Sequence, residues 1–249
     1  MVKVEINPKF ESLRKEIEKI PDTIAVCGDK IFQGRNRIYR STMSGVDLTV
    51  KEFRVPSALN RIVYSTVRRS KACRSYLNAM HLQSLGIDTP EPIAYIEEHC
   101  HGMLRRSYYV CRYIEGDTIR QWETRIADSD KMLDALGQFT LTLHRNGVLH
   151  KDFSPGNIIY RRDADGAFHF ALVDINRMEF GVHSKKRLYR NFRSINIESE
   201  EQTLRFAEAY ARAAGIDPAA MRDIARCKLH AYYREKALHR RLKSLIRKK

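Results

Sequence analysis

The stretch LHKDFSPGNIIY, residues 149–160, constrains the fold of this chain more than any other. It sets His150, Asp152 and Asn157 around a Ser-Pro-Gly turn, and an apolar run follows directly. Turn residues end regular structure, and the short apolar run is typical of a buried strand. A carboxylate and an amide on one short loop could hold a metal ion and a hydroxyl together, or they could be ordinary turn residues. Other features of the chain have to discriminate between these two interpretations.

The length and composition indicate a globular protein. With 249 residues, 43% hydrophobic and 30% charged, the chain can form one bilobal unit or two small domains with real cores. No apolar run approaches the roughly 20 residues that a membrane-spanning helix needs. The first ten residues, MVKVEINPKF, carry charge and lack the apolar core of a signal peptide. We therefore expect a cytoplasmic protein.

The net charge of +15 is large and predicts an anionic partner. Charge alone leaves a nucleotide, a phosphorylated sugar, an acidic lipid surface and a nucleic acid as candidates. We do not expect a nucleic acid as the partner, because the chain has no recognisable nucleic-acid-binding motif and no aromatic platform for stacking bases. The terminal segment RRLKSLIRKK could contact an anionic membrane surface, or it could be a solvated helix.

The five cysteines do not indicate a disulfide scaffold or a zinc site. None of them forms a Cys-x-x-Cys pair. The segment His99-Cys100-His101 lies between two strand-like runs, which favours a hairpin turn over a metal site, since a closed zinc site needs about four converging ligands.

The first half of the chain reads as strands with one long helix. We expect a helical segment at 7–20 that ends before Pro21, and a hairpin around Ser44-Gly45. In the second hairpin strand, VDLTVKEF, Leu48 and Val50 point to one face while Thr49, Lys51 and Phe53 point to the other. A helix over 57–85 should end at Gly86, and two strands should follow at 92–98 and 107–116.

Helices dominate after Gly116. Asp117 is placed to cap a helix that contains Trp122, and Leu133, Leu136, Phe139 and Leu143 form an apolar stripe on another, which Asn146-Gly147 should end. The run RRDADGAFHFALVDI predicts a hairpin with Asp-Gly at its tip, and residues 198–249 should be helical with a break at GIDP. The order predicts an α+β protein with a small β-rich lobe, residues 1–115, and a larger helical lobe, residues 116–249.

Three more polar positions fit the loop at 152–157. Lys51 lies within a strand, Asp174 ends the strand ALVD, and Gly34 begins a tight turn, QGRN. Together these parts suit phosphoryl transfer, which depends on positioning and charge neutralisation. A strand Lys can reach nucleotide phosphates, an Asp can take a proton from an acceptor hydroxyl, and an Asn and a second Asp supply oxygen ligands for magnesium.

These segments resemble known proteins. HKDFSPGN is similar to the catalytic loop of the protein-kinase-like fold, LVDIN to its metal-binding segment and TVKEF to its third strand. More narrowly, GRNRI, SKACRSYLNAMHLQSLGIDTPEPIAYIEE and LVDINRM resemble the bacterial lipopolysaccharide kinase (Kdo/WaaP) family, over about residues 30–180.

The resemblance implies a bilobal protein-kinase-like enzyme. With ATP and Mg²⁺ it would phosphorylate a sugar hydroxyl of the lipopolysaccharide core or lipid A, a Kdo or heptose residue. The acceptor would be an anionic glycolipid or sugar, and the protein would work in the cytoplasm, either free or as a peripheral protein at the inner face of the membrane.

The resemblance also implies roles for individual residues. Asp152 would be the catalytic base and Lys51 would contact the phosphates. Asn157 and Asp174 would hold magnesium. The phosphate-covering turn would be Gly34, Arg35, Asn36 and Arg37, and the backbone that pairs with adenine would be Arg112, Tyr113 and Ile114.

Two departures from the kinase pattern keep alternatives open. The phosphate turn has one glycine, so few backbone N–H groups can approach phosphates freely. The helix carboxylate that usually pairs with the strand Lys is missing: its place is Ser75, and no acidic residue lies between Glu52 and Asp88. Lys51 must then be held by Asp174, by nucleotide or by nothing, and a nucleotide-binding pseudokinase remains an alternative.

Other residues bear on the acceptor. The helix before Gly86 is strongly basic and could receive an anionic acceptor, or it could present a solvated face. Its cations are Arg61, Arg68, Arg69, Lys71 and Arg74. Ser154 stands where Ser/Thr protein kinases place a Lys, which disfavours protein substrates but leaves other small-molecule or protein kinases open. We expect His150 to brace the loop rather than to act in catalysis.

Overall fold

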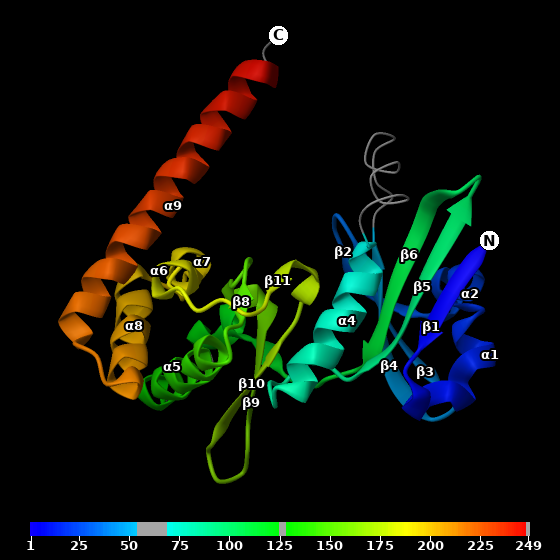
Figure 1. The fold of residues 1–249 in the computed structure, drawn as a ribbon, viewed down its shortest axis with the longest axis horizontal. Coiled ribbons are helices and arrows are strands. Elements are labelled where there is room, and N and C mark those ends of the chain that lie inside the picture. The colour runs from blue at the N-terminus through cyan, green and yellow to red at the C-terminus, as the bar shows by residue number, and fades with distance from the viewer. Residues whose placement is uncertain (54–68, 125–127, 248–249) are drawn as a thin grey trace. The chain divides into compact units, whose positions relative to one another are not determined.

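The computed structural model describes residues 1–53, 69–124 and 128–247. The chain divides into two compact units (Figure 1). The first comprises Met1–Glu115 together with Asp174–Arg177, and the second comprises Gly116–Val173 and Met178–Lys249. The short segment Asp174–Arg177 therefore belongs with the first unit although its neighbours in sequence belong to the second.

An antiparallel sheet of six strands forms the first unit, in the order β1-β5-β6-β4-β3-β2. The strands are β1 (Val2–Ile6), β2 (Asp29–Gln33), β3 (Arg37–Met43), β4 (Val46–Phe53), β5 (Pro92–Cys100) and β6 (Met103–Arg112). Strand β1 was not predicted; it pairs along β5, from Val2 opposite Glu98 to Ile6 opposite Ala94. The predicted strand at 107–116 is shorter at its end, since β6 stops at Arg112.

Both predicted hairpin turns of this unit are present. Ser44 and Gly45 both have positive φ, 45° and 78°, as a two-residue turn of a twisted hairpin requires. His101 and Gly102 make an equivalent turn, with φ of 48° and 73°, so the segment around Cys100 is a hairpin end. Leu48 and Val50 are fully buried on the sheet's core face, as their alternation predicts.

The N-terminal helical segment differs from the prediction of one helix ending before Pro21. It consists of a 3-10 helix η1 (Pro8–Leu13), then α1 (Arg14–Ile17) and α2 (Ile20–Cys27). Pro21 lies in the first turn of α2, where its missing N–H has no helical partner to lose, so it begins a helix rather than ending one. Leu13, Ile17 and Ile24 pack into the sheet core.

Helix α4 (Lys71–Ser84) is the described part of the helix predicted over 57–85; residues 57–68 lie outside the described residues. Ser70 caps its start, since its Oγ accepts from the Cys73 amide at 3.0 Å. Gly86, with φ of 68°, ends it as predicted.

The second unit is mainly helical. Its principal helices are α5 (Ser129–Arg145), α8 (Glu200–Ala214) and α9 (Pro218–Arg247), with the short α6 (Lys185–Leu188) and α7 (Asn191–Ser194). The predicted stripe on α5 is buried at Leu133, Leu136 and Leu143. Gly137 lets α5 approach α8 closely, because a Cβ there would lie 2.7 Å from the backbone nitrogen of Tyr210.

Small strands of the second unit carry the loop at 150–157. β9 (Ile158–Arg162) and β10 (Phe168–Leu172) form the predicted hairpin, and β7 (Asp117–Thr118) pairs with β9. β8 (Leu149–His150) pairs with β11 (Met178–Glu179). Asp117, predicted to cap the helix that contains Trp122, lies in β7, and Trp122 lies in a short 3-10 helix, η2 (Ile119–Thr124).

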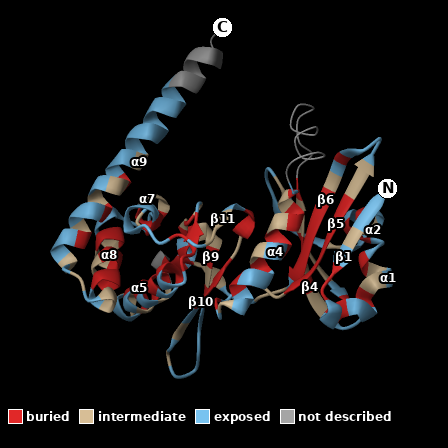
Figure 2. Cartoon of the chain, in the orientation of Figure 1, coloured by how far each residue is buried: buried red, intermediate tan, exposed pale blue. Residues whose placement is uncertain are grey.

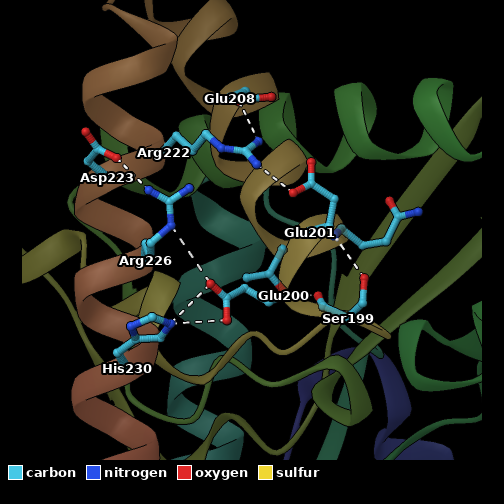
Figure 3. Close-up of polar contacts among 10 residues, drawn as sticks. Ser199, Glu200, Glu201, Glu208, Arg222, Asp223, Arg226 and His230 are labelled. Carbon is cyan, nitrogen blue, oxygen red and sulfur yellow. Dashed lines mark hydrogen bonds and ion pairs between the residues drawn. The ribbon is translucent and has the colours of Figure 1, made fainter.

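Ion pairs fix α9 against α8 (Figure 3). Arg222 contacts Glu201 at 2.6 Å and Glu208 at 2.8 Å, and His230 lies 3.1 Å from Glu200. Between these polar contacts, α9 buries an apolar stripe at spacings of four residues. The stripe is Met221, Ala225 and Leu229.

Residues 233–241 of α9 are exposed (Figure 2). In the described part of the chain, no helix combines the length and the apolar character that crossing a membrane requires.

Candidate active site

Lys51 on β4 pairs with Asp174. Its Nζ lies 2.6 Å from Asp174 Oδ1, and the Lys51 side chain is only 15% exposed. Asn176 donates to the same carboxylate oxygen, also at 2.6 Å. Of the three possibilities for holding Lys51, the structure therefore has Asp174 as the partner.

Asp174 also has an unusual backbone. Its φ is 54°, in the left-handed region that non-glycine residues rarely adopt. Such conformations cost of order 1 kcal/mol or more and persist where the surrounding structure requires them, often at functional sites. Asp174 is thus held in a fixed orientation that aims its carboxylate at Lys51.

Helix α4 is fixed to the segment after Asp174 without a carboxylate. Arg74 Nη1 donates to the Asn176 carbonyl oxygen at 3.0 Å, and Asn78 Nδ2 donates to that of Ile175 at 2.7 Å. Ser75, at the place of the missing Glu, donates within the helix to the Lys71 carbonyl oxygen at 2.9 Å. Two hydrogen bonds to backbone thus hold α4 where most kinases use a Lys–Glu ion pair.

Positive charge gathers around Asp174. Burial lowers the pKa of Lys71, and repulsion from Arg177 and Arg35 lowers it further, while Asp174 opposes this shift. The Lys71 and Lys51 ammonium groups lie 6.0 Å and 5.4 Å from the centre of one aromatic ring, that of Phe53. Several cations near one carboxylate make a site suited to a polyanion.

The sequence identified Lys71 only as one cation of a basic helix that could receive an anionic acceptor or present a solvated face, and it did not predict the position of Lys71 near Asp174. Of that set, Arg74 is bound to the Asn176 carbonyl oxygen, and Arg61 and Arg68 lie outside the described residues. No signal in the sequence distinguishes Lys71 from its basic neighbours, because its proximity to Asp174 depends on tertiary packing.

The predicted phosphate turn lies between β2 and β3. The Gly34 amide donates to the Asn36 carbonyl oxygen at 3.0 Å, which closes the turn on itself. Arg37 is paired with Glu52 at 3.3 Å. Arg35 is the cation of this turn that acts on Lys71.

The predicted adenine-pairing backbone, Arg112 to Ile114, is partly engaged within the protein. The Arg112 amide donates to Glu91 O and the Tyr113 amide donates to Asp47 O, both at 2.8 Å. Arg40 stacks over the Tyr113 ring at 4.0 Å. Among the described residues the Ile114 amide has no backbone partner.

In the second unit, His150 braces the loop as predicted. The Asp152 amide donates to His150 Nδ1 at 3.1 Å, and Nε2 lies 3.1 Å from the Val173 carbonyl oxygen. Nδ1 is therefore the acceptor and Nε2 carries the proton. His150 is buried, so its ring fixes Asp152 relative to the end of β10.

Asn157 lies against Asp152 on the same loop. Its Nδ2 donates to the Asp152 backbone oxygen at 2.8 Å, a bond that does not use its amide oxygen. The Val173 amide donates to the Asn157 backbone oxygen at 2.9 Å. Within the ranges that the structure describes, the Asp152 carboxylate has no hydrogen-bond or ion-pair partner.

The structure thus joins the predicted residues in two pairs. Lys51 and Asp174 meet in the first unit, and Asp152 and Asn157 meet in the second. Along the chain, the first unit's segment Asp174–Arg177 follows directly after Val173 of the second unit. The described residues contain no group of three or more His, Cys, Asp and Glu side chains that could hold a metal ion.

The six-stranded sheet, the helical unit and the ordered Lys, Asp, Asn and Asp define a protein-kinase-like phosphotransferase. Solved structures share this fold. "WaaP in complex with acyl carrier protein" matches with a TM-score of 0.62 and 18% identity, over 93% of this chain and 99% of that chain. An aminoglycoside-3'-phosphotransferase of type VIII matches with a TM-score of 0.57 and 10% identity, over 88% and 98% of the two chains.

The model of the lipopolysaccharide kinase (Kdo/WaaP) family matches residues 33–213, and the chain belongs to this family. The predicted family, the kinase-like fold and the assignment as a phosphotransferase are confirmed. A comparison with curated protein sequences gave no match.

Proposed function

We propose that this protein transfers the γ-phosphate of ATP to a sugar hydroxyl of lipopolysaccharide, on a Kdo or heptose residue of the core or lipid A region. The observation that carries the proposal is the cluster of cations around the Lys51–Asp174 pair, combined with membership of the family. A polyanion such as a triphosphate is the ligand that this charge arrangement favours.

Lys51, Lys71 and Arg35 would bind the phosphates. Lysine contributes a compact charge with three donors, and charge-assisted hydrogen bonds to phosphate are among the stronger ones. The Ile114 amide would pair with adenine. The backbone of Arg112 and Tyr113 would support that strand end through their own hydrogen bonds.

Magnesium fits the available donors. The Asn157 amide oxygen and the Asp174 carboxylate are the hard oxygen ligands that this ion prefers, and magnesium usually takes one or two protein ligands plus phosphate oxygens. When bound, the ion would neutralise charge on the phosphates. Within the protein, Lys51 and Asn176 orient the Asp174 carboxylate, and Asp152 O orients the Asn157 amide.

Asp152 would act as the base. The acceptor oxygen forms a bond to the γ-phosphorus, the bond from that phosphorus to ADP breaks, and the acceptor proton passes to Asp152. An aspartate without a protein partner among the described residues, on a backbone braced by His150, suits this role.

A nucleotide-binding pseudokinase is the alternative that the missing helix Glu raises. The hydrogen bonds of Arg74 and Asn78 supply another means of fixing α4, which favours the active enzyme. Another small-molecule or protein kinase on this fold would share the nucleotide site. The acceptor therefore needs a direct assay.

The basic charge suits work on an anionic glycolipid in the cytoplasm, as a peripheral protein at the inner face of the membrane. In this proposal the membrane supplies the acceptor, and electrostatic attraction brings the enzyme to it.

The test is transfer of labelled phosphate from ATP to purified lipopolysaccharide, followed by mass analysis of the sugars. We expect the wild-type protein to add phosphate to a Kdo or heptose residue. Asp152→Ala should lower the transfer rate by about 100- to 10,000-fold, the range for loss of a general base.

Nucleotide affinity separates the outcomes. Asp152→Ala should bind ATP as the wild type does, because Asp152 is not assigned to the phosphates. Transfer that survives Asp152→Ala at the wild-type rate would reject the mechanism. Nucleotide binding without transfer to lipopolysaccharide, aminoglycoside or protein acceptors would favour the pseudokinase.

A further inference from the structure

A pocket in the second unit opens directly at Asp152. It encloses about 230 Å³, and its walls come from the catalytic loop, α7 and α9. This volume is below the roughly 300–1,000 Å³ of sites that hold a whole drug-sized ligand, so it suits one charged portion of a larger molecule. The residues that matter for its chemistry are Lys151, Asp152, Arg190, Arg193, Ser194 and Tyr232.

Apolar anchors hold the α6–α7 segment in place and leave its arginines at the pocket. Leu188 and Phe192 are buried, and Phe192 packs edge-on against Tyr210 with ring centres 5.2 Å apart. Ser194 Oγ donates to the Phe153 carbonyl oxygen at 3.0 Å, which ties α7 to the residue after Asp152. Arg190 and the catalytic loop are therefore positioned by the same packing.

Three cations line the pocket, and two of them already have partners. Lys151 pairs with Glu179, and Arg193 pairs with Glu235 of α9 and lies 5.6 Å from the Tyr232 ring centre. Arg190 has no side-chain partner among the described residues.

Arg190 and Asp152 line one pocket without forming an ion pair with each other. A guanidinium and a carboxylate, both available in one small pocket, define a ligand with two features. It presents a hydroxyl to Asp152 and an anionic group to Arg190.

We propose that this pocket receives the acceptor sugar, and that Arg190 binds a carboxylate or phosphate on it while its hydroxyl faces Asp152. The inference rests on the proposed function and assigns acceptor recognition to α7 rather than to the basic helix α4. Arginine binds such groups through two parallel hydrogen bonds, which gives orientation as well as affinity.

Glu235 adds a second element to this site. Glu235 lies on α9, and its carboxylate forms an ion pair with Arg193. The ion pairs of Arg222 and His230 with α8 hold α9 in place. An anionic acceptor competes with Glu235 for Arg193. Removing the Glu235 charge should therefore strengthen binding of the acceptor.

The experiment measures binding and transfer with matched probes. These are the methyl glycoside of Kdo, the same sugar with its carboxylate reduced to an alcohol, and a heptose phosphate with its unphosphorylated form. We expect Arg190→Gln to weaken binding of the charged probe of one pair by about 10- to 100-fold, as for loss of a charge-assisted contact. Its neutral partner should bind equally to both proteins. If the Kdo pair shows this difference, Arg190 binds a carboxylate of the acceptor; if the heptose pair shows it, Arg190 binds a phosphate.

Three further variants sharpen the result. Arg190→Lys should keep part of the affinity, since it keeps the charge but loses the bidentate geometry. Glu235→Gln should tighten binding of the charged probe severalfold. Lys186→Gln removes a charge four residues before Arg190 without lining the pocket, and it should change nothing.

The outcomes separate the pocket from the reaction. Equal binding of charged probes to wild type and Arg190→Gln, or equal losses for charged and neutral probes, would overturn the pocket assignment while transfer by the wild type stands. Arg190-dependent binding without any phosphate transfer would support the pocket and refute the proposed function. In transfer assays Arg190→Gln should raise KM and leave kcat nearly unchanged.

Discussion

At the scale of single residues, the Lys51–Asp174 pair is the centre of the account. The sequence predicted each partner by its place at a strand, and the structure adds that they hold each other at 2.6 Å. Asn176, two residues after Asp174, completes the arrangement; it belongs to the segment LVDIN, but the sequence assigned it no role of its own. In the proposed mechanism a nucleotide would supply further oxygens to Lys51, whose side chain the pair with Asp174 already holds in place.

Lys71 gives the first residue-scale prediction. Because its ammonium is half-buried among cations, a bound polyanion would relieve the repulsion that lowers its pKa. We expect Lys71→Gln to raise the Kd for ATP by about 10-fold, within the range for a charge-assisted contact. Titration of ATP binding by calorimetry measures this directly.

Lys15→Gln is the matched control, since Lys15 is an exposed cation of α1 in the same unit. It should leave the Kd for ATP unchanged. If Lys71→Gln also left the Kd for ATP unchanged, Lys71 would not bind the phosphates, and its side chain would contact the acceptor or only the solvent.

At the scale of elements, helix α4 shows why the missing Glu could not be interpreted from sequence. Its replacements, Arg74 and Asn78, donate to backbone carbonyls of residues 176 and 175. Every residue has a backbone carbonyl, so these hydrogen bonds do not require a particular residue type at positions 175 and 176. The sequence therefore showed that the helix carboxylate is missing, but it did not show which contacts replace it.

The packing of α5 on α8 gives a prediction about pH. Burial lowers the pKa of His144 to about 4, from 6.5. The unfolded chain therefore binds this proton more tightly than the folded protein. The stability that depends on neutral His144 is complete above about pH 6.5 and is lost as the pH falls toward 4, by about 3 kcal/mol in all.

Urea unfolding at pH 7.5 and 4.5 tests this prediction. Between pH 7.5 and pH 4.5, we expect the free energy of unfolding to fall by about 2–3 kcal/mol less in His144→Gln than in the wild type, because Gln does not titrate. His183→Gln is the control, since His183 is exposed, and its pH dependence should follow that of the wild type. Parallel pH dependence of the wild type and His144→Gln would show that burial does not lower the pKa of His144.

At the scale of the whole molecule, local signals predicted local structure. Ser44-Gly45, Asn146-Gly147 and Asp165-Gly166 end or reverse elements where the sequence placed them, because turn chemistry depends on adjacent residues. Pro21 was misread because the same residue can stop a helix or begin one. Strand β1 was missed because it is short and is held by pairing with β5, more than 80 residues away.

The candidate site follows the same rule. Residue types and their order predicted Lys51, Asp152, Asn157 and Asp174 as site residues, and all four lie within residues 33–213, which the family model matches. The pocket with Arg190 and Arg193 was not predicted, because it depends on how α7 and α9 pack beside the catalytic loop. Motifs therefore predict the nucleotide chemistry, whereas recognition of the acceptor depends on tertiary structure.

The most direct test of the central claim is a crystal structure with magnesium and a non-hydrolysable ATP analogue. We expect one magnesium ion to contact the Asn157 amide oxygen and the Asp174 carboxylate at about 2.0–2.1 Å. We also expect phosphate oxygens within hydrogen-bond distance of Lys51, and the Asp152 carboxylate facing the γ-phosphate. A nucleotide whose phosphates lie away from Lys51, or an ion held by other residues, would contradict the central claim.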